Sequence, residues 1–276
     1  MSSQLPSNPP RNVLITGAAS GIGKAVAGAL LSDGHKVTVV DVNAEALATA
    51  QNDLGPSDRV HFVEADITSD ADCERAVAES VKRFGSLQAL FNNAGIGMGV
   101  IRGDAEVNHP SIEELTPDIW ERFFSVNCLG PIRMTRAAIA ELKTGGWGRI
   151  INNSTSYLTM LRVQPYGAVK SALESTSAVW AKELDGTGIT VNVIVPGGPT
   201  DTPFVVEIGI PRQNMLRPTV MAPPIQWLMS DESNGFTGRR IVAGHWDTTL
   251  APATAAAKVA RTIGWPELTG DVIWLD

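Results

Sequence analysis

A glycine-rich turn between a short apolar run and a helical pattern constrains this chain more than any other feature. The apolar run is 13–15, the turn reads TGAASGIG at 16–23, and the helical pattern continues to about Leu31, where Asp33-Gly34 ends it. Glycines at these places permit a tight turn, let the backbone approach a pyrophosphate and allow the helix to pack closely on the strand. The helix N-terminus then presents free N–H groups and the positive end of its dipole to a phosphate. The pattern therefore predicts a strand–turn–helix unit that binds a dinucleotide.

Short apolar runs and longer helical patterns continue to alternate along the chain. Strands are expected at 36–40, 60–63, 87–91, 149–151 and 189–195, and helices at 44–54, 70–84, 116–142 and 165–184. Alternation at this spacing is typical of right-handed βαβ crossovers around a parallel sheet. The strands are nearly all apolar, as expected when helices cover both faces of the sheet. We therefore predict an α/β fold with a Rossmann-type doubly wound parallel sheet.

No linker rich in proline, glycine or serine divides the chain, so a single domain is expected. We predict a flexible N-terminal tail at 1–11, a dinucleotide-binding catalytic domain at 12–243 and a C-terminal extension at 244–276. An alanine-rich helix is expected at about 252–260 in the extension, with Trp246, Trp265 and Trp274 around it. Because exposed tryptophans are costly, the extension should pack on the same domain or on a neighbouring subunit.

Charge and composition argue against several classes of protein. The formal net charge of −7 disfavours a nucleic-acid-binding surface, which needs a clustered basic face. No apolar run reaches the roughly 20 residues of a membrane span, and the N-terminal segment lacks the apolar stretch of a signal peptide. The four histidines and two cysteines lack metal-ligand spacing, so no catalytic metal is expected. We expect a cytoplasmic protein of enzyme size that acts on a small molecule.

The cofactor preference is expected to depend on Asp41, which ends the second predicted strand 20 residues after Gly21. A carboxylate in this place accepts hydrogen bonds from both ribose hydroxyls of NAD. It would repel the 2′-phosphate of NADP, which favours a nearby Arg or Lys instead. The flanking residues Ser20 and Val42 are not basic. The sequence therefore predicts NAD rather than NADP.

Tyr166 and Lys170 are four residues apart on a predicted helix, so their side chains project from the same face. A free tyrosine has a pKa of about 10, too high for a base at neutral pH. A neighbouring ammonium group lowers that pKa by stabilising the phenolate. The pair occurs often by chance, so its interpretation depends on the motifs around it.

Five ordered motifs give the chain a resemblance to the short-chain dehydrogenase/reductase family. They are TGAASGIG at 16–23, Asp66-Ile67 after the third strand, NNAG at 92–95, Val126-Asn127 in a helix and YGAVK at 166–170. The resemblance runs from about Asn12 to Val242. It implies a seven-stranded parallel sheet, a homotetramer and hydride transfer with the cofactor bound first.

The resemblance assigns catalytic roles to residues that match the family's motifs. It implies that Tyr166 donates or accepts the proton and that Lys170 binds the nicotinamide ribose and lowers the pKa of Tyr166. It also implies that Asn127 holds a proton-relay water.

Further matches imply a set of cofactor contacts. Asp66-Ile67 resembles the adenine-binding pair, Asn93 the asparagine on the ribose side, and Pro196-Gly197 the segment that contacts the carboxamide. The residues expected to bind the cofactor are Gly17, Ser20, Gly21, Ile22, Gly23, Asp41, Asp66, Ile67, Asn93, Ala94, Gly95, Tyr166, Lys170, Pro196, Gly197 and Pro199.

The hydroxyl that contacts the substrate oxygen has several candidates. The family places a serine 13 residues before the tyrosine, but that position here is Asn153. Counting forward along the strand from Gly148 leads instead to Thr155, and a loop after the strand can absorb a deletion of two residues. A threonine hydroxyl can still donate a hydrogen bond to the substrate. Thr155 is therefore favoured, with Ser154 second and Ser156 third.

Two long segments are expected to enclose the substrate, a loop within 95–116 and the segment 198–217. Most residues near them are apolar: Tyr157, Leu158, Met160, Leu161, Val163, Phe204 and Met215. The resemblance implies an NAD-dependent oxidoreductase that interconverts a secondary alcohol and its ketone, and the apolar residues predict a hydrophobic or aromatic substrate. Alternatives are an epimerase, dehydratase or enoyl reductase on the same fold, or a catalytically silent NAD-binding regulator.

Overall fold

The first strand, β1 (Asn12–Thr16), runs into the glycine-rich turn, and α1 (Gly21–Ser32) begins at the second glycine of that turn. Gly17 and Gly21 have φ angles of 63° and 51°, in the left-handed region that disfavours side chains. These two residues let the chain reverse from strand to helix within a few residues. The computed structural model describes residues 9–205 and 209–265.

The remaining elements alternate along the chain as the sequence pattern predicts. The strands are β2 (Lys36–Asp41), β3 (Val60–Glu64), β4 (Ala89–Asn92), β5 (Gly148–Asn153), β6 (Ile189–Val195), β7 (Arg239–Val242) and β8 (Ala260–Thr262). The α-helices are α2 (Ala44–Leu54), α3 (Asp70–Phe84), α4 (Pro117–Phe124), α5 (Gly130–Thr144), α6 (Tyr157–Met160), α7 (Tyr166–Glu183), α8 (Ala222–Leu228) and α9 (Pro252–Val259).

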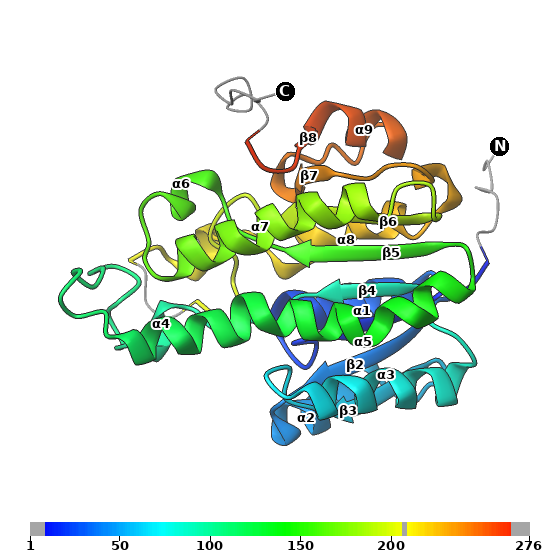
Figure 1. Cartoon of the computed structure of the whole chain (residues 1–276), viewed down its shortest axis with the longest axis horizontal. Coiled ribbons are helices and arrows are strands. Elements are labelled where there is room, and N and C mark those ends of the chain that lie inside the picture. The colour runs from blue at the N-terminus through cyan, green and yellow to red at the C-terminus, as the bar shows by residue number, and fades with distance from the viewer. Residues whose placement is uncertain (1–8, 206–208, 266–276) are drawn as a thin grey trace, which may run out of the picture.

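The strands form one sheet in the order β3-β2-β1-β4-β5-β6-β7-β8 (Figure 1). Strands β1 to β7 pair in parallel, and β8 pairs with β7 in the antiparallel direction. The doubly wound parallel architecture is thus confirmed, but the sheet has eight strands rather than the predicted seven. The strand order reverses between β1 and β4, and ligands of open α/β sheets bind at such a switch point.

Helices cover both faces of the sheet, and each face has its own apolar core. On β1, the side chains of Val13 and Ile15 enter a core with α1, α2 and α8, while that of Leu14 enters the core with α3, α5 and α7. Adjacent side chains of a strand point to opposite faces, so a strand buried on both faces must be apolar throughout. In Figure 1, α3, α5 and α7 lie in front of the sheet and α1 and α8 behind it.

The helix predicted over 116–142 is divided into three parts. α4 ends at Phe124, a π-helical turn spans Ser125–Leu129, and α5 continues from Gly130 with Pro131 in its first turn. Proline has no N–H to donate, so the regular hydrogen-bond ladder is interrupted there. Such π-turns inside helices are frequent at functional sites.

The C-terminal extension packs on the same chain as far as it is described. Trp246 lies 5.8 Å from Trp227 of α8, and Trp265 lies 6.3 Å from Tyr157, both measured between ring centroids. α9 occupies almost the predicted range, whereas β8 was not predicted because its three residues follow α9 with no turn residue between them. Trp274 lies outside the described residues.

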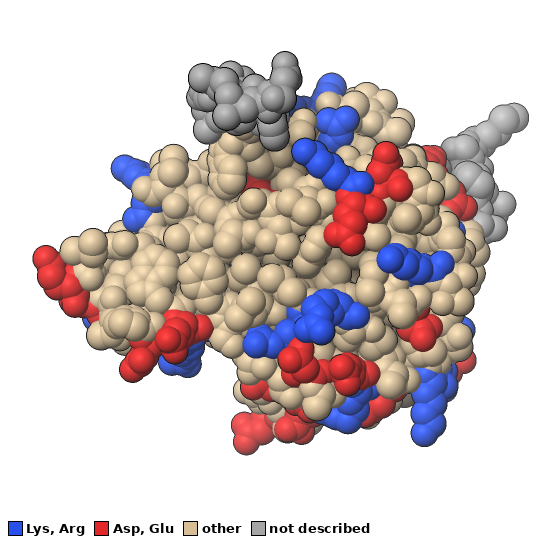
Figure 2. Space-filling view, in the orientation of Figure 1, with Lys and Arg blue, Asp and Glu red and all other residues tan. Residues whose placement is uncertain are grey.

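On the face shown in Figure 2, acidic and basic side chains lie next to one another, and the centre of the face over α7 is mostly uncharged. Within the described residues, no helix combines the length and apolar character needed to cross a membrane. The tetramer implied by the resemblance stays a prediction, since the structure holds one chain.

The two-sided core yields a stability prediction. Leu90 of β4 is fully buried, so we expect Leu90→Ala to lower the free energy of unfolding by about 2–5 kcal/mol. Val179 of α7 is 59% exposed and provides the control. Val179→Ala should change the free energy of unfolding by about 0.5 kcal/mol or less. Urea unfolding measures both, and equal losses would contradict the assignment of Leu90 to the core.

Candidate active site

The glycine-rich turn packs directly against the turn that follows β4. A Cβ atom added to Gly17 would lie 2.7 Å from Ala94 Cα, and one added to Gly23 would lie 2.5 Å from the carbonyl oxygen of Gly17. The Asn93 side-chain amide donates to the carbonyls of Thr16 and Gly17, each at 3.1 Å. Backbone thus contacts backbone across the switch point, and larger residues would force the two turns apart.

This cradle leaves the start of α1 accessible to a phosphate. Ser20, the N-cap residue, makes no side-chain cap to the helix, so the first N–H groups of α1 keep their capacity to donate to an anion. Ile22 instead packs its side chain against the core beneath the turn. The glycines and the uncapped helix start fit the pyrophosphate of a dinucleotide.

Asp41 lies at the end of β2, beside the glycine-rich turn. One oxygen of its carboxylate accepts from the backbone N–H of Ala19 at 3.2 Å, and the other accepts from that of Asn43 at 3.1 Å. These contacts fix the carboxylate next to the cradle, where a ribose of the dinucleotide would lie.

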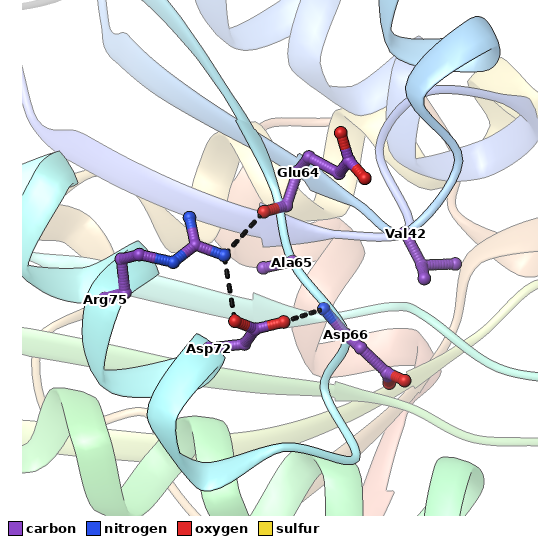
Figure 3. A pocket seen from close by; sticks show the side chains of 6 residues that line it. All are labelled: Val42, Glu64, Ala65, Asp66, Asp72 and Arg75. Carbon is purple, nitrogen blue, oxygen red and sulfur yellow. Dashed lines mark hydrogen bonds and ion pairs between the residues drawn. The ribbon is translucent and has the colours of Figure 1, made fainter.

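A cavity of about 440 Å³ lies beyond Asp41, between the ends of β2 and β3 (Figure 3). The Asp66 N–H donates to Asp72, and Arg75 donates to both Asp72 and the Glu64 carbonyl. The hydrogen bonds from Asp66 and Arg75 lower the pKa of the Asp72 carboxyl. The residues that line the cavity are Val42, Glu64, Ala65, Asp66, Asp72 and Arg75.

Of the predicted adenine-binding pair, only Asp66 lines this cavity. Ile67 is buried beneath α5, where a Cβ added to Gly130 would lie 2.5 Å from its side chain. The Ile67 side chain therefore belongs to the core and not to the cavity.

Asn127 lies in the π-helical turn and is fully buried. Its side-chain oxygen accepts from the N–H of Ile96 at 3.0 Å, and its amide donates to the Ile96 carbonyl at 3.0 Å. A Cβ on Gly95 would lie 2.5 Å from the same oxygen, so the NNAG turn needs glycine there. These contacts tie the helix to the loop that follows β4.

Tyr166 and Lys170 occupy the first turns of α7, beside the end of β5. The Lys170 ammonium donates to the carbonyl of Asn153 at 2.8 Å and lies 5.8 Å from the centre of the Tyr166 ring. Burial lowers the pKa of Lys170 to about 8. Burial also raises the pKa of the Tyr166 phenol, and the charge of Glu106 raises it further, while a hydrogen bond from Thr155 opposes both effects. Burial is the largest of these effects on the pKa of the phenol.

The three candidate hydroxyls point in different directions. The Thr155 side chain lies near the Tyr166 phenol, whose pKa it lowers. Ser154 is buried and donates to Glu174 at 3.4 Å, while the Ser156 oxygen caps α6 by accepting from the N–H of Thr159 at 3.0 Å. The geometry thus brings Thr155, and neither serine, to the phenol. Asn153, the residue at the family's usual spacing, directs its amide to Asn93 at 3.1 Å.

The segment after β6 crosses the same edge of the sheet. Gly197 has a φ of 100°, and the Pro196 carbonyl accepts from the N–H of Gly244 at 2.8 Å. The Pro199 carbonyl accepts from the N–H of Leu216 at 2.9 Å. Further on, Thr202 lies over the glycine-rich turn, since a Cβ on Gly21 would be 3.0 Å from its methyl group.

The two segments expected to enclose the substrate meet above Tyr166. The Phe204 ring lies 5.9 Å from that of Tyr166, and a Cβ on Gly97 would lie 2.8 Å from the Phe204 ring. Val163 packs in the same apolar cluster as Tyr166. Met160 and Met215 are buried, whereas Leu158 and Leu161 are 62% and 86% exposed.

Several residues at this site were not identified from the sequence. The Glu106 carboxylate accepts from the N–H of Met98 at 3.1 Å, and burial raises the pKa of Glu106. Asp201 pairs with Arg212 and Arg217 at 2.6 and 2.8 Å, joining the two ends of the segment that carries Phe204. No motif or spacing marks these residues, because their partners come from other parts of the loops.

Comparisons with known proteins agree with this geometry. A family model described as short chain dehydrogenase matches residues 11–212. "NADPH-dependent aldehyde reductase 2, chloroplastic" of Arabidopsis thaliana is 33% identical over 267 residues, which are 86% of this chain and 95% of that protein. A "Short-chain type dehydrogenase/reductase" of Picea abies is 31% identical over 242 residues, 80% of this chain and 86% of that protein.

A solved structure extends the similarity to three dimensions. The 3-ketoacyl-(acyl-carrier-protein) reductase of Brucella melitensis, complexed with NADH, matches with a TM-score of 0.71 at 28% identity and covers 82% of this chain and 93% of its own. The chain therefore belongs to the short-chain dehydrogenase/reductase family, whose members are oxidoreductases that act on carbonyl or alcohol groups with a nicotinamide cofactor.

The different environments of the three hydroxyls lead to a prediction. If Thr155 has the role that the resemblance implies, Thr155→Ala should lower kcat on the order of 100-fold, since one hydrogen-bond donor to the substrate oxygen would be lost. Thr155→Ser should keep most of the activity. Ser156→Ala is the matched control: it removes a hydroxyl one residue away, costs about 1 kcal/mol of stability through the lost helix cap and should leave kcat unchanged. Steady-state kinetics would refute the assignment if only the Ser156 variant lost turnover.

Proposed function

We propose that the chain is an NAD-dependent oxidoreductase that interconverts a secondary alcohol and a ketone by hydride transfer, with Tyr166 as the acid/base. One observation carries the proposal: Tyr166, Lys170, Thr155 and Asn127 converge at the carboxyl ends of β4 and β5, next to the glycine cradle. A phenol paired with a hydroxyl at the edge of a dinucleotide site is suited to moving a proton at a carbinol oxygen.

The residues present fit a dinucleotide that extends from the cavity at Asp66 across the cradle to Tyr166. Asp66 and Asp41 would hold the adenosine part, Gly17, Gly21 and Gly23 the pyrophosphate, and Lys170 the nicotinamide ribose. When bound, the cofactor supplies the acceptor or donor of the hydride. The protein contributes the placement of the substrate carbon and the transfer of the proton.

The proton moves at the Tyr166 hydroxyl. Burial raises the pKa of the phenol and so favours its protonated form, which suits Tyr166 to donate a proton to a ketone oxygen. In the oxidative direction it would accept the alcohol proton, which needs added positive charge close to the ring, such as a protonated Lys170. Thr155 would donate to the same substrate oxygen and hold it in line with the phenol.

The preference for NAD rests on the surroundings of Asp41. Two cations on helices beside the turn and the cavity are paired with carboxylates: Lys24 contacts Asp53 at 2.6 Å, and Arg75 contacts Asp72 at 2.9 Å. Val42, which follows Asp41, is 63% exposed and offers no positive charge to a 2′-phosphate. A carboxylate without an available cation disfavours NADP. The names of the relatives leave this choice open, since one is NADPH-dependent and one structure contains NADH.

The substrate is proposed to be hydrophobic, and an aromatic group is favoured. Phe204 and Val163 border Tyr166, and Ile96 and Met98 belong to the loop on the other side. An apolar wall of this kind gains free energy by burying apolar ligand surface, at roughly 25 cal/mol per Å².

The reaction is tested with a panel of 1-phenylethanol, 2-octanol and sorbitol, each with NAD and with NADP, by following reduced nicotinamide at its absorbance band. We expect turnover of the first two alcohols with NAD. Tyr166→Phe should lower kcat about 10²- to 10⁴-fold, because the proton transfer is lost while the ring is kept. Full turnover by Tyr166→Phe would refute the acid/base role, and turnover of sorbitol alone would refute the hydrophobic substrate.

The cofactor preference is tested with Asp41→Ala. Loss of hydrogen bonds to a charged group costs about 1.5–3 kcal/mol, so the Kd for NAD should rise roughly 10- to 100-fold while the Kd for NADP falls or stays constant. Asp58→Ala, an exposed carboxylate in the turn before β3, is the control and should change neither constant. Calorimetric binding of each dinucleotide measures these values, and an unchanged preference in Asp41→Ala would contradict the proposal.

A further inference from the structure

A buried ion pair lies behind the catalytic residues and has no place in the mechanism so far. Glu174 of α7 and Arg240 of β7 are 0% and 4% exposed, and their side chains are in direct contact. Glu174 also accepts hydrogen bonds from Tyr157 at 3.0 Å and from Ser154 at 3.4 Å. Its carboxylate is therefore contacted from α6, from β7 and from the segment that follows β5.

Arg240 reaches from this pair to the active site. One of its terminal nitrogens donates to Glu174, and the other donates to the backbone carbonyl of Thr155. The guanidinium lies 4.1 Å from the centre of the Tyr157 ring, within the range of a cation–π contact. The same residue whose hydroxyl meets Tyr166 thus has its carbonyl bound by Arg240.

The chain that leaves β5 is held at successive positions by these contacts. The Asn153 carbonyl accepts from Lys170 at 2.8 Å, the Ser154 N–H donates to the Ile194 carbonyl at 3.0 Å, and the Thr155 carbonyl accepts from Arg240. Two cations, one on α7 and one on β7, therefore fix alternate carbonyls of an extended segment. Neither contact follows from regular sheet pairing.

Stability alone does not account for this arrangement. Taking two charges out of water costs several kcal/mol per ion, and well-packed apolar residues are often as stabilising or more so. The rigid, forked guanidinium has a different advantage, since it fixes two acceptors in one plane. Here those acceptors are the helix that carries Tyr166 and the segment that carries Thr155.

We propose that Glu174 and Arg240 are positioning residues that hold the Thr155 hydroxyl in register with Tyr166, by tying the Thr155 backbone to α7. The inference rests on the proposed function of Thr155 and Tyr166. Tyr166, Lys170 and Glu174 share one helix, so Arg240 connects Thr155 to the same rigid element that carries the acid/base. Loss of the connection leaves the substrate oxygen with a displaced donor, and small displacements at a reacting centre cost up to about 10²-fold in rate.

The C-terminal extension takes part in the same network. The Tyr157 hydroxyl contacts both Glu174 and the carbonyl of Gly264, each at 3.0 Å. Gly264 follows β8, the strand that pairs with β7 beside Arg240. The extension thereby contacts, through Gly264 and Tyr157, the Glu174 side chain that pairs with Arg240.

The test uses Arg240→Met, which keeps the length of the side chain and removes both hydrogen bonds, in the full-length protein with 1-phenylethanol and NAD. We expect kcat to fall about 10- to 100-fold with KM close to the wild-type value, because donor geometry is needed most in the transition state. Arg240→Lys keeps the charge but can serve one acceptor at a time, and should restore part of kcat. Ile241→Val on the same strand is fully buried and is the matched control for destabilisation of β7; its kcat should not change.

A double-mutant cycle separates positioning from general destabilisation. If Arg240 acts through Thr155, then Arg240→Met should have no further effect on kcat in a Thr155→Ala background. Multiplicative losses in the double variant would overturn the proposal, as would a wild-type kcat for Arg240→Met while Tyr166→Phe loses turnover. A wild-type kcat for Arg240→Met would overturn only the positioning role and would leave the proposed function standing.

A structural readout covers the case in which no alcohol of the panel is turned over. In a crystal structure of Arg240→Met, or of Arg240→Leu if the first variant does not fold, we expect the Thr155 hydroxyl to move away from the Tyr166 phenol. An unchanged contact between these two side chains would overturn the proposal without reference to activity. Tyr166→Phe with full turnover would instead refute the proposed function itself.

Discussion

The close contact between two backbone turns at the switch point of the sheet sets the place of every other group in this protein. Gly17 and Gly23 bring the turn after β1 against Ala94 in the turn after β4, with no room for a Cβ on either glycine. The amide of Asn93, in the same turn as Ala94, adds hydrogen bonds to the carbonyls of Thr16 and Gly17. Because the sheet order reverses between these strands, the crevice for the dinucleotide lies here, and the ends of β2, β5 and β6 surround it.

Charged side chains are buried near both ends of β5, where the cations among them donate to backbone carbonyls. Lys170 and Arg240 each donate to a carbonyl of the chain that leaves β5, and Glu174 neutralises the second of them. Arg149, at the opposite end of β5, also donates to backbone carbonyls and has its pKa lowered to about 10 by burial. Buried cations in this fold thus serve chain segments that leave the regular hydrogen-bond ladder, where carbonyls would otherwise lack donors.

Much of the fold was predictable because its signals are local. Periodicity and glycine positions located β1 to β6 and most helices, and the spacing of Tyr166 and Lys170 on one helix face follows from helix geometry alone. The break between α4 and α5 was missed because its pattern remains helical on both sides of the π-turn. β8 was missed because three residues without apolar alternation are recognised as a strand only through their pairing with β7.

The sequence by itself determined the βαβ architecture, the glycine cradle, Asp41 at the end of its strand and the Tyr166–Lys170 pair, since each depends on residues close together in the chain. Only the tertiary structure decided which of three neighbouring hydroxyls meets Tyr166, because one residue of shift at the end of a strand turns a side chain to the opposite face. It also decided that Glu174 and Arg240, 66 residues apart, share a buried contact, and that the extension reaches Tyr157 through Gly264. Contacts of this kind arise from the packing of distant segments, and no local pattern in the chain encodes them.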